Sequence, residues 1–236
     1  MSSTTQNIVS VVLVHGAWAD GSSWSRVIPL LQAEGLTVVA AQLPLTSLAD
    51  DVAAAERALI SAPGSVVLVG HSWGGMIVTE AGDDPKVAAL VYVAAFSGAE
   101  GQSTGELVNA HSKPPALETI RDDGNGFVYV TEQGMIENVA PDLTQVEART
   151  MAVTQGPLAA RTFADKLTKA AWKTRPSWYI VSANDRCVSV DLERGAAKLM
   201  GSTTTELASG HLSLMSHPEE VAHVILQAVS AVSTKQ

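Results

Sequence analysis

One serine in this sequence stands at a spacing that suits nucleophilic chemistry. Residues 65–75 read SVVLVGHSWGG, so an apolar run ends in a G-x-S-x-G pattern, and an apolar segment with helical potential follows over residues 76–82. A strand, a sharp turn and a helix in this order can lift the Ser72 hydroxyl clear of a sheet on strained backbone. The flanking glycines leave room for close packing. The backbone N–H of Trp73 can then help to bind a developing oxyanion.

A serine hydroxyl needs a base to activate it, and the base needs an acid to orient it. Asp185 follows the apolar run at residues 178–181, and His211 follows the short run at residues 203–207. Each residue therefore stands just past the end of a predicted strand. The order Ser72, Asp185, His211 predicts a catalytic triad.

Other acids and histidines fit structural roles better. Asp191 is expected to open a helix, where a carboxylate favours the helix dipole. His217 precedes a proline at a predicted helix start, and His71 is expected to pack beside the serine. We expect solvated positions for His111 and His223, and a small apolar filler role for Cys187. No spacing of histidines, cysteines and carboxylates predicts a metal site, and no phosphate-binding motif is present, so we expect no cofactor.

The second half of an oxyanion hole must come from the loop after the first predicted strand. His15-Gly16-Ala17 stands there, which makes the backbone N–H of Ala17 the second predicted donor; the alternative is a plain turn. Trp18 is expected either to pack or to line the substrate pocket. The same choice applies further along to Phe127, Tyr129, Met135, Phe163 and Trp172.

The elements around these residues alternate. Apolar runs at residues 8–14, 36–41, 65–71 and 87–95 predict buried strands, and helical patterns lie between them. This alternation predicts an α/β fold, with a mostly parallel sheet and helices on both faces. It returns with strands at residues 177–182 and 203–207 and helices at 192–200 and 218–232.

Residues 97–172 break this alternation. Glycine, proline and polar residues are frequent up to residue 126, and two helices are predicted at 143–154 and 158–168. We interpret residues 97–172 as a lid inserted into a core formed by residues 1–96 and 173–236, because lids and binding loops are often built from such insertions.

The bulk composition limits the partners and the compartment. The 236 residues carry a formal charge of −9 with no basic cluster, which argues against nucleic acid and anionic membranes as partners. No apolar run is long enough to span a bilayer. Residues 1–7 lack the pattern of a signal peptide, and a single cysteine allows no internal disulfide, so we expect a cytoplasmic protein. Both a monomer and a homodimer remain open.

With these residues in hand, the chain resembles the α/β-hydrolase superfamily over nearly its whole length. The sequence at residues 12–18, Val-Leu-Val-His-Gly-Ala-Trp, and the Gly-His-Ser-Trp-Gly-Gly turn look like the small esterase branch, which includes plant methyl-ester esterases and hydroxynitrile lyases. The resemblance implies a triad of Ser72, Asp185 and His211, backbone donors at Ala17 and Trp73, and a mobile lid.

Three residues bear on the activity that the resemblance implies. The plant hydroxynitrile lyases carry a lysine after the catalytic histidine, where this chain has Leu212, and a threonine after the first-strand histidine, where it has Gly16. Both departures favour hydrolysis. The superfamily's dehalogenases and epoxide hydrolases use an aspartate at the turn, so Ser72 speaks against them.

These observations predict an enzyme that hydrolyses a small carboxylic ester through an acyl-enzyme. The same triad could act on a lactone, an amide or a C–C bond, or catalyse a perhydrolase side reaction. A ligand-binding receptor on the same fold is a further alternative. A third alternative is an interaction protein with a decayed site, which predicts that Ser72 and His211 lie too far apart for a hydrogen bond.

Overall fold

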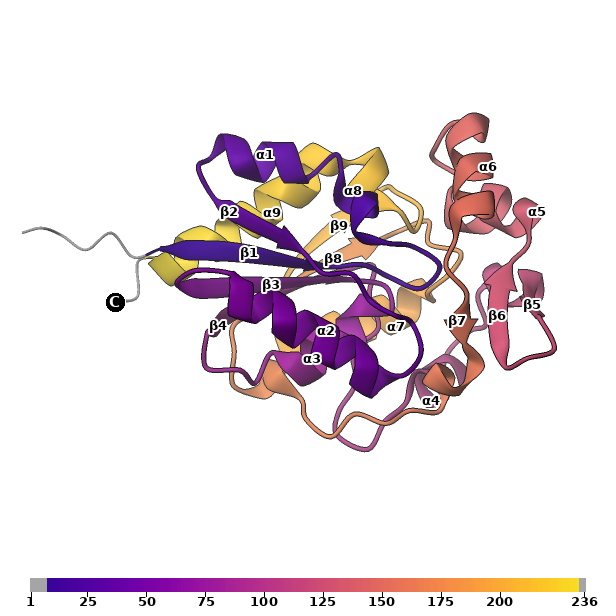
Figure 1. The fold of residues 1–236 in the computed structure, drawn as a ribbon, viewed down its shortest axis with the longest axis horizontal. Coiled ribbons are helices and arrows are strands. Elements are labelled where there is room, and N and C mark those ends of the chain that lie inside the picture. Colours follow the sequence, from indigo (N-terminus) through magenta and orange to yellow (C-terminus); the bar gives the residue numbers. More distant parts are fainter. Residues whose placement is uncertain (1–7, 234–236) are drawn as a thin grey trace, which may run out of the picture.

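The computed structural model describes residues 8–233 and is built around a parallel sheet (Figure 1). Its six strands lie in the order β2-β1-β3-β4-β8-β9, and every neighbouring pair is parallel. The predicted absence of a signal peptide concerns residues 1–7, which lie outside the described residues. The strands are β1 (Val9–Val14), β2 (Thr37–Ala40), β3 (Ser65–His71), β4 (Val87–Val93), β8 (Ser177–Ser182) and β9 (Thr203–Leu207).

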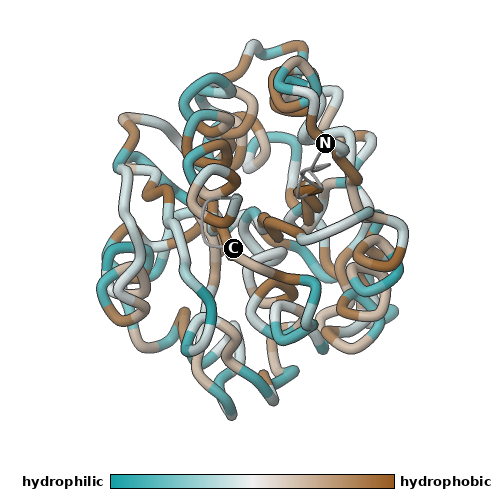
Figure 2. The backbone as a smooth tube through the Cα atoms, turned by 90° about the vertical axis from the view of Figure 1, so that its left-hand side faces the viewer, coloured by the Kyte–Doolittle hydropathy of each residue, from teal (hydrophilic) through white to brown (hydrophobic). Residues whose placement is uncertain are grey.

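Helices cover both faces of this sheet, as predicted. Along β1, Val11 and Leu13 belong to one buried apolar cluster, and Val12 and Val14 belong to the other, because successive side chains of a strand point to opposite faces. The first cluster includes residues of α1 (Ile28–Ala33) and α9 (Pro218–Ser233). The second includes residues of α2 (Leu48–Ser61), α3 (Gly74–Ala81) and α7 (Val190–Met200). In Figure 2 the flanking helices carry hydrophobic and hydrophilic residues in alternation along the tube.

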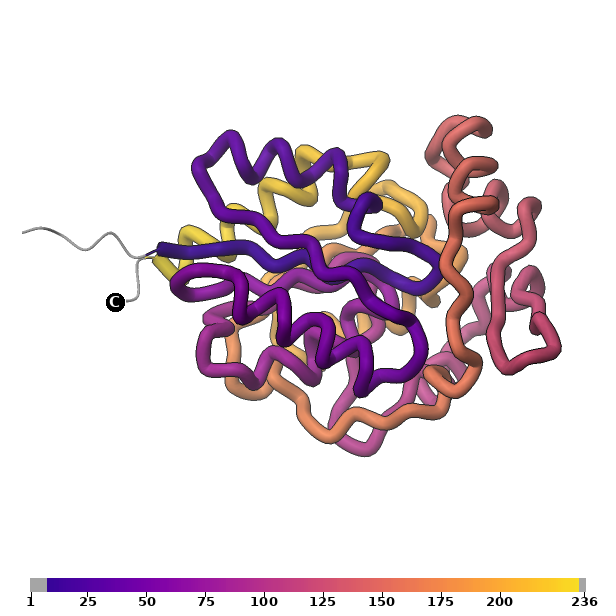
Figure 3. The backbone as a smooth tube through the Cα atoms, viewed as in Figure 1, coloured from indigo at the N-terminus to yellow at the C-terminus, as the bar shows by residue number. Residues whose placement is uncertain are grey.

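The segment between β4 and β8 carries a second, antiparallel sheet of the order β5-β6-β7. Figure 1 and Figure 3 show β5 to β7, α5 and α6 beyond the end of the main sheet toward which β1 runs, whereas the orange stretch that leads to β8 runs back alongside the core. Its elements are α4 (Thr104–Asn109), η2 (Pro115–Thr119), β5 (Ile120–Asp122), β6 (Phe127–Val130), α5 (Glu132–Gly134), the π-helix η3 (Met135–Val139), α6 (Gln145–Thr154), β7 (Leu158–Ala159), and the 3-10 turns η4 (Ala160–Phe163) and η5 (Ala171–Lys173).

Two backbone carbonyls tie this segment to the core. The indole N–H of Trp18 donates to the Val128 carbonyl of β6 at 3.0 Å, and the Ala159 N–H of β7 donates to the Leu45 carbonyl at 2.9 Å. These two hydrogen bonds hold the small sheet against the loops that follow β1 and β2.

Two helix predictions were wrong in detail. The predicted helix at residues 158–168 is the short strand β7 followed by η4, because residues 158 and 159 pair with β6. The helical pattern between the predicted strands at residues 8–14 and 36–41 is divided into the 3-10 turn η1 (Gly21–Trp24) and α1, which has a proline in its first turn. At residues 158 and 159, pairing with β6 outweighs the local propensity for a helix.

Within residues 8–233, no helix combines the length and the apolar character needed to cross a membrane.

The packing of α3 gives a first prediction. A Cβ added at Gly75 would lie 2.2 Å from the Phe96 carbonyl oxygen, whereas one added at Gly156 would meet its nearest atom, on Leu45, at 3.6 Å. We expect Gly75→Ala to lower the free energy of unfolding by about 1–3 kcal/mol, since overpacking forces the backbone apart. Gly156→Ala is the matched control and should change it by less than about 1 kcal/mol. Urea denaturation checks both variants, and equal stabilities would contradict the packing described.

Candidate active site

The backbone of Ser72 adopts a left-handed conformation, with φ of +53°, between β3 and α3. Three hydrogen bonds hold it there. The Ser72 N–H donates to the Val93 carbonyl at 3.2 Å, and the Ser72 carbonyl accepts from the N–H groups of Gly75 at 3.0 Å and Phe96 at 3.1 Å. A non-glycine residue in this region is strained and persists only where its surroundings impose it. The sharp turn predicted at Ser72 is therefore present.

The glycines around Ser72 are explained by contact distances. A Cβ at Gly70 would lie 2.5 Å from the carbonyl oxygen of Gly74, and one at Gly74 would lie 2.6 Å from that of Val14. A Cβ at Gly16 would lie 2.8 Å from the Cβ of Ser72. The loop after β1 thus packs directly against the serine, as an oxyanion loop must.

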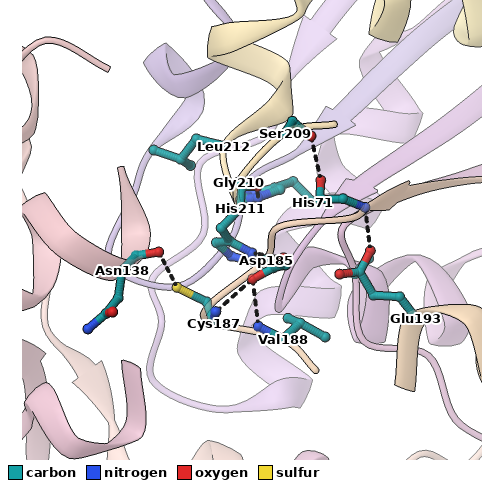
Figure 4. A network of polar contacts seen from close by, with 12 residues as sticks. His71, Asn138, Asp185, Cys187, Val188, Glu193, Ser209, Gly210, His211 and Leu212 are labelled. Carbon is teal, nitrogen blue, oxygen red and sulfur yellow. Dashed lines mark hydrogen bonds and ion pairs between the residues drawn. The ribbon is translucent and has the colours of Figure 1, made fainter. Parts of the chain in front are cut away.

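His211 and Asp185 form a buried pair. Nδ1 of His211 lies 2.6 Å from Oδ2 of Asp185. The other Asp185 oxygen accepts from the N–H groups of Cys187 at 2.6 Å and Val188 at 2.9 Å (Figure 4). An ionised carboxylate only accepts hydrogen bonds, so the proton of the neutral imidazole resides on Nδ1. Nε2 of His211 is then left as the basic nitrogen.

Ser72 and His211 line the same cavity. Among the described residues, no hydrogen bond joins the Ser72 hydroxyl to the His211 imidazole. This absence is what the decayed-site alternative predicts. It is also common in ligand-free enzymes, where catalytic hydrogen bonds often tighten only when substrate binds. The structure brings the predicted base to the predicted acid and to the cavity of the predicted nucleophile, and activity must decide between the two interpretations.

The two predicted oxyanion donors, Ala17 and Trp73, also line this cavity. Their backbone N–H groups have no hydrogen-bond acceptor within residues 8–233. His15 holds the first loop in place, because its Nε2 accepts from the Leu43 N–H at 3.0 Å and its Nδ1–H donates to the Gly16 carbonyl at 2.8 Å. Burial lowers the pKa of His15, which keeps this arrangement neutral.

The tryptophans predicted at the pocket have different positions. Trp18 lines the cavity and reaches β6 through its indole N–H. Trp172 does not line it: its indole N–H donates to the Gly98 carbonyl at 2.8 Å, and the Lys173 ammonium lies 5.8 Å from the centre of its ring. Trp172 thus belongs to the packing of residues 97–172. Of the other aromatic and sulfur side chains weighed for the pocket, Met135 and Phe163 line it.

His71 contacts the loop of His211 rather than packing passively. Its Nε2–H donates to the His211 carbonyl at 3.0 Å, and the two ring centres lie 4.6 Å apart. Burial lowers the pKa of His71 well below its ordinary value, with the neighbouring His211 as the second cause. A neutral His71 therefore helps to fix the position of His211.

Glu193 is a residue that the sequence analysis missed. It lies on α7 and is fully buried, and its Oε2 accepts from the Ser182 N–H at 3.0 Å (Figure 4). Burial, followed by the charge of Asp185, raises the pKa of Glu193 well above its ordinary value. The sequence pattern that could have found Glu193 is its position one turn before Ala196 and Ala197. Residues three or four apart lie on the same face of a helix, so Glu193 shares the buried face of these alanines.

Asp185, Cys187 and His211 form a cluster of possible metal ligands whose donor atoms lie within 4.8 Å of one another. The sequence spacing did not predict this grouping. Both oxygens of Asp185 already accept hydrogen bonds, and burial raises the pKa of the Cys187 thiol well above its ordinary value. Metals bind the thiolate rather than the thiol, so the donors fit a hydrogen-bonded pair of Asp185 and His211 better than a metal centre.

The fold agrees with the comparisons with known proteins. Residues 11–224 match the model of the alpha/beta hydrolase family, and the chain belongs to that family. It is 24% identical to "Probable hydrolase R7" of Phoma sp., over 92% of this chain and 96% of that protein. It is 28% identical to "Methylesterase 7" of Arabidopsis thaliana, over 92% and 94%. A solved pyrethroid hydrolase from Sphingobium faniae superposes with a TM-score of 0.82 at 22% identity, over 94% and 98%.

The buried Glu193 carboxyl gives a prediction of pH dependence. Its pKa in the folded chain lies above the ordinary 4.5, so the folded state binds more protons than the unfolded state above about pH 4.5. This contribution to the free energy of unfolding falls as the pH rises toward the folded pKa. Glu193→Gln cannot lose a proton. We expect the free energy of unfolding of Glu193→Gln, relative to that of wild type, to increase between pH 5 and pH 8. The increase should be about 1.4 kcal/mol for each unit by which the folded pKa of Glu193 exceeds 4.5.

Urea unfolding at several pH values measures this difference. Exposed Glu34→Gln is the matched control and should follow the wild-type curve. Parallel curves for wild type and Glu193→Gln would show that Glu193 is ionised in the folded protein.

Proposed function

We propose that this protein is a serine hydrolase that cleaves a small carboxylic ester. The observation that carries the proposal is the 2.6 Å bond between His211 Nδ1 and Asp185 Oδ2, which leaves the other histidine nitrogen basic in the cavity of Ser72. Ser72 is presented by a strained turn that the surrounding strands impose. Neither feature is needed for a plain strand-to-helix connection.

In the proposed reaction His211 acts first as a base and then as an acid. His211 Nε2 takes the proton as the Ser72 hydroxyl attacks the ester carbonyl, and Asp185 stabilises the imidazolium that forms. The free N–H groups of Ala17 and Trp73 stabilise the oxyanion. His211 then protonates the leaving alcohol. Water, activated by His211, attacks the acyl-enzyme and releases the acid and Ser72.

Ester hydrolysis is favoured over related reactions by what surrounds the triad. Leu212 is buried and lines the cavity at the position where hydroxynitrile lyases carry a lysine, so no cation is available there to accept cyanide. The relative named as a methylesterase supports an ester substrate, and the relative named as a hydrolase supports hydrolysis. We further propose that residues 97–172 act as the lid, since Met135 and Phe163 from this segment line the cavity.

The first test is covalent labelling by a fluorophosphonate, located by mass spectrometry. We expect the wild type to be labelled at Ser72, and Ser72→Ala to lose both the label and roughly 10⁴-fold or more of its turnover of short-chain esters, as in serine hydrolases generally. Ser97→Ala is the matched control: Ser97 is buried, its hydroxyl has no hydrogen-bond partner, and it lies outside the cavity lining. An unlabelled Ser72 in folded protein would favour the decayed site, and saturable ligand binding without acid release would favour a receptor.

A further inference from the structure

The cavity carries no carboxyl, ammonium or guanidinium group among the described side chains that line it. Its lining among the described residues is mostly aliphatic, aromatic and sulfur-containing, with no aspartate, glutamate, lysine or arginine. A charged substrate group placed here would lose its water without gaining an ionic partner, which is costly. The cavity therefore favours an ester that is uncharged on both sides of its carbonyl.

Most polar side-chain groups of the lining are already engaged. The indole N–H of Trp18 donates to the Val128 carbonyl, and that of Trp73 donates to Asp51 at 2.7 Å. The thiol of Cys187 donates to the Asn138 carbonyl at 3.4 Å. His71 is held by His211 through Nε2, and only its Nδ1, beside the serine, has no partner. These groups are not available to bind a distal part of the substrate.

Thr104 is different. It is the first residue of α4, lines the cavity and is 1% exposed, and its hydroxyl has no hydrogen-bond partner within residues 8–233. The start of α4 does not need this hydroxyl, because Ser103 and Glu106 cap the helix reciprocally. A buried hydroxyl without a partner costs about 1–3 kcal/mol, and a ligand that supplies the partner recovers part of this.

We propose that Thr104 is a specificity-determining residue whose hydroxyl hydrogen-bonds an oxygen of the substrate outside the scissile ester. The substrate class is then an uncharged, largely apolar ester that carries one further hydrogen-bonding oxygen, such as a ketone or hydroxyl. This inference rests on the proposed function. Val108, which also lines the cavity one turn further along α4, provides the apolar surface beside that oxygen.

The test compares methyl esters of matched chain length. One set carries a keto group at successive chain positions, a second has methylene at the same places, and a third carries a carboxylate. For wild type we expect one keto ester to have a higher kcat/KM than its methylene partner, and the carboxylate ester to have the lowest. Thr104→Val, which keeps the shape but removes the hydroxyl, should lower the keto-to-methylene ratio about tenfold, equivalent to about 1.4 kcal/mol. Thr104→Ser should preserve the ratio.

The inference is overturned if the wild type prefers no keto ester, or if Thr104→Val leaves the preference intact. An equal loss on both esters also overturns it, because that pattern reports a packing defect. Labelling of wild-type Ser72 by a fluorophosphonate separates the two proposals. Without labelling, the proposed function itself fails; with labelling and an unchanged ratio, only the role of Thr104 fails.

Discussion

The site depends on how closely backbone approaches backbone around Ser72. The serine is held in a left-handed conformation by carbonyl and N–H groups of Val93, Gly75 and Phe96, so β4 and the loop after it impose the strain. The loop after β1 packs against the same turn, where Gly16 leaves no space for a side chain. This packing presents the hydroxyl and leaves the N–H groups of Ala17 and Trp73 without acceptors. A small shift of these strands would displace the Ser72 hydroxyl and the N–H groups of Ala17 and Trp73.

Hydrogen bonds and burial govern the carboxyl groups beside this turn. Asp185 accepts three hydrogen bonds, and burial raises the pKa of the neighbouring Glu193 carboxyl well above its ordinary value. The buried histidines His15 and His71 have lowered pKa values and act as neutral donors that hold the loops. The cavity beside His211 is lined by no aspartate, glutamate, lysine or arginine among the described residues. Such a lining suits an uncharged substrate and favours release of an anionic acid.

The core could be predicted from the sequence because its signals are local. Continuous apolar runs mark buried parallel strands, and the turn glycines and strand-end positions mark Ser72, Asp185 and His211. In the segment between β4 and β8, α6 matches the helix predicted at residues 143–154. The strands of this segment could not be predicted, because they pair with partners distant in the chain: residues 158 and 159 join β6 although they read as a helix. Glu193 is distinguished by its burial and Thr104 by a buried hydroxyl without a hydrogen-bond partner. The sequence reports neither feature directly.

Trapping the acyl-enzyme tests the account most directly. Wild-type protein is mixed with a short-chain activated ester, quenched in acid within the first turnovers, digested and analysed by mass spectrometry. If Ser72 is the nucleophile, the acyl group of the ester is bound to the peptide containing Ser72. The modified peptide then disappears once the ester is consumed. Ester consumption with the acyl group on another residue, or with no acylated peptide at any time, would contradict Ser72 as the nucleophile.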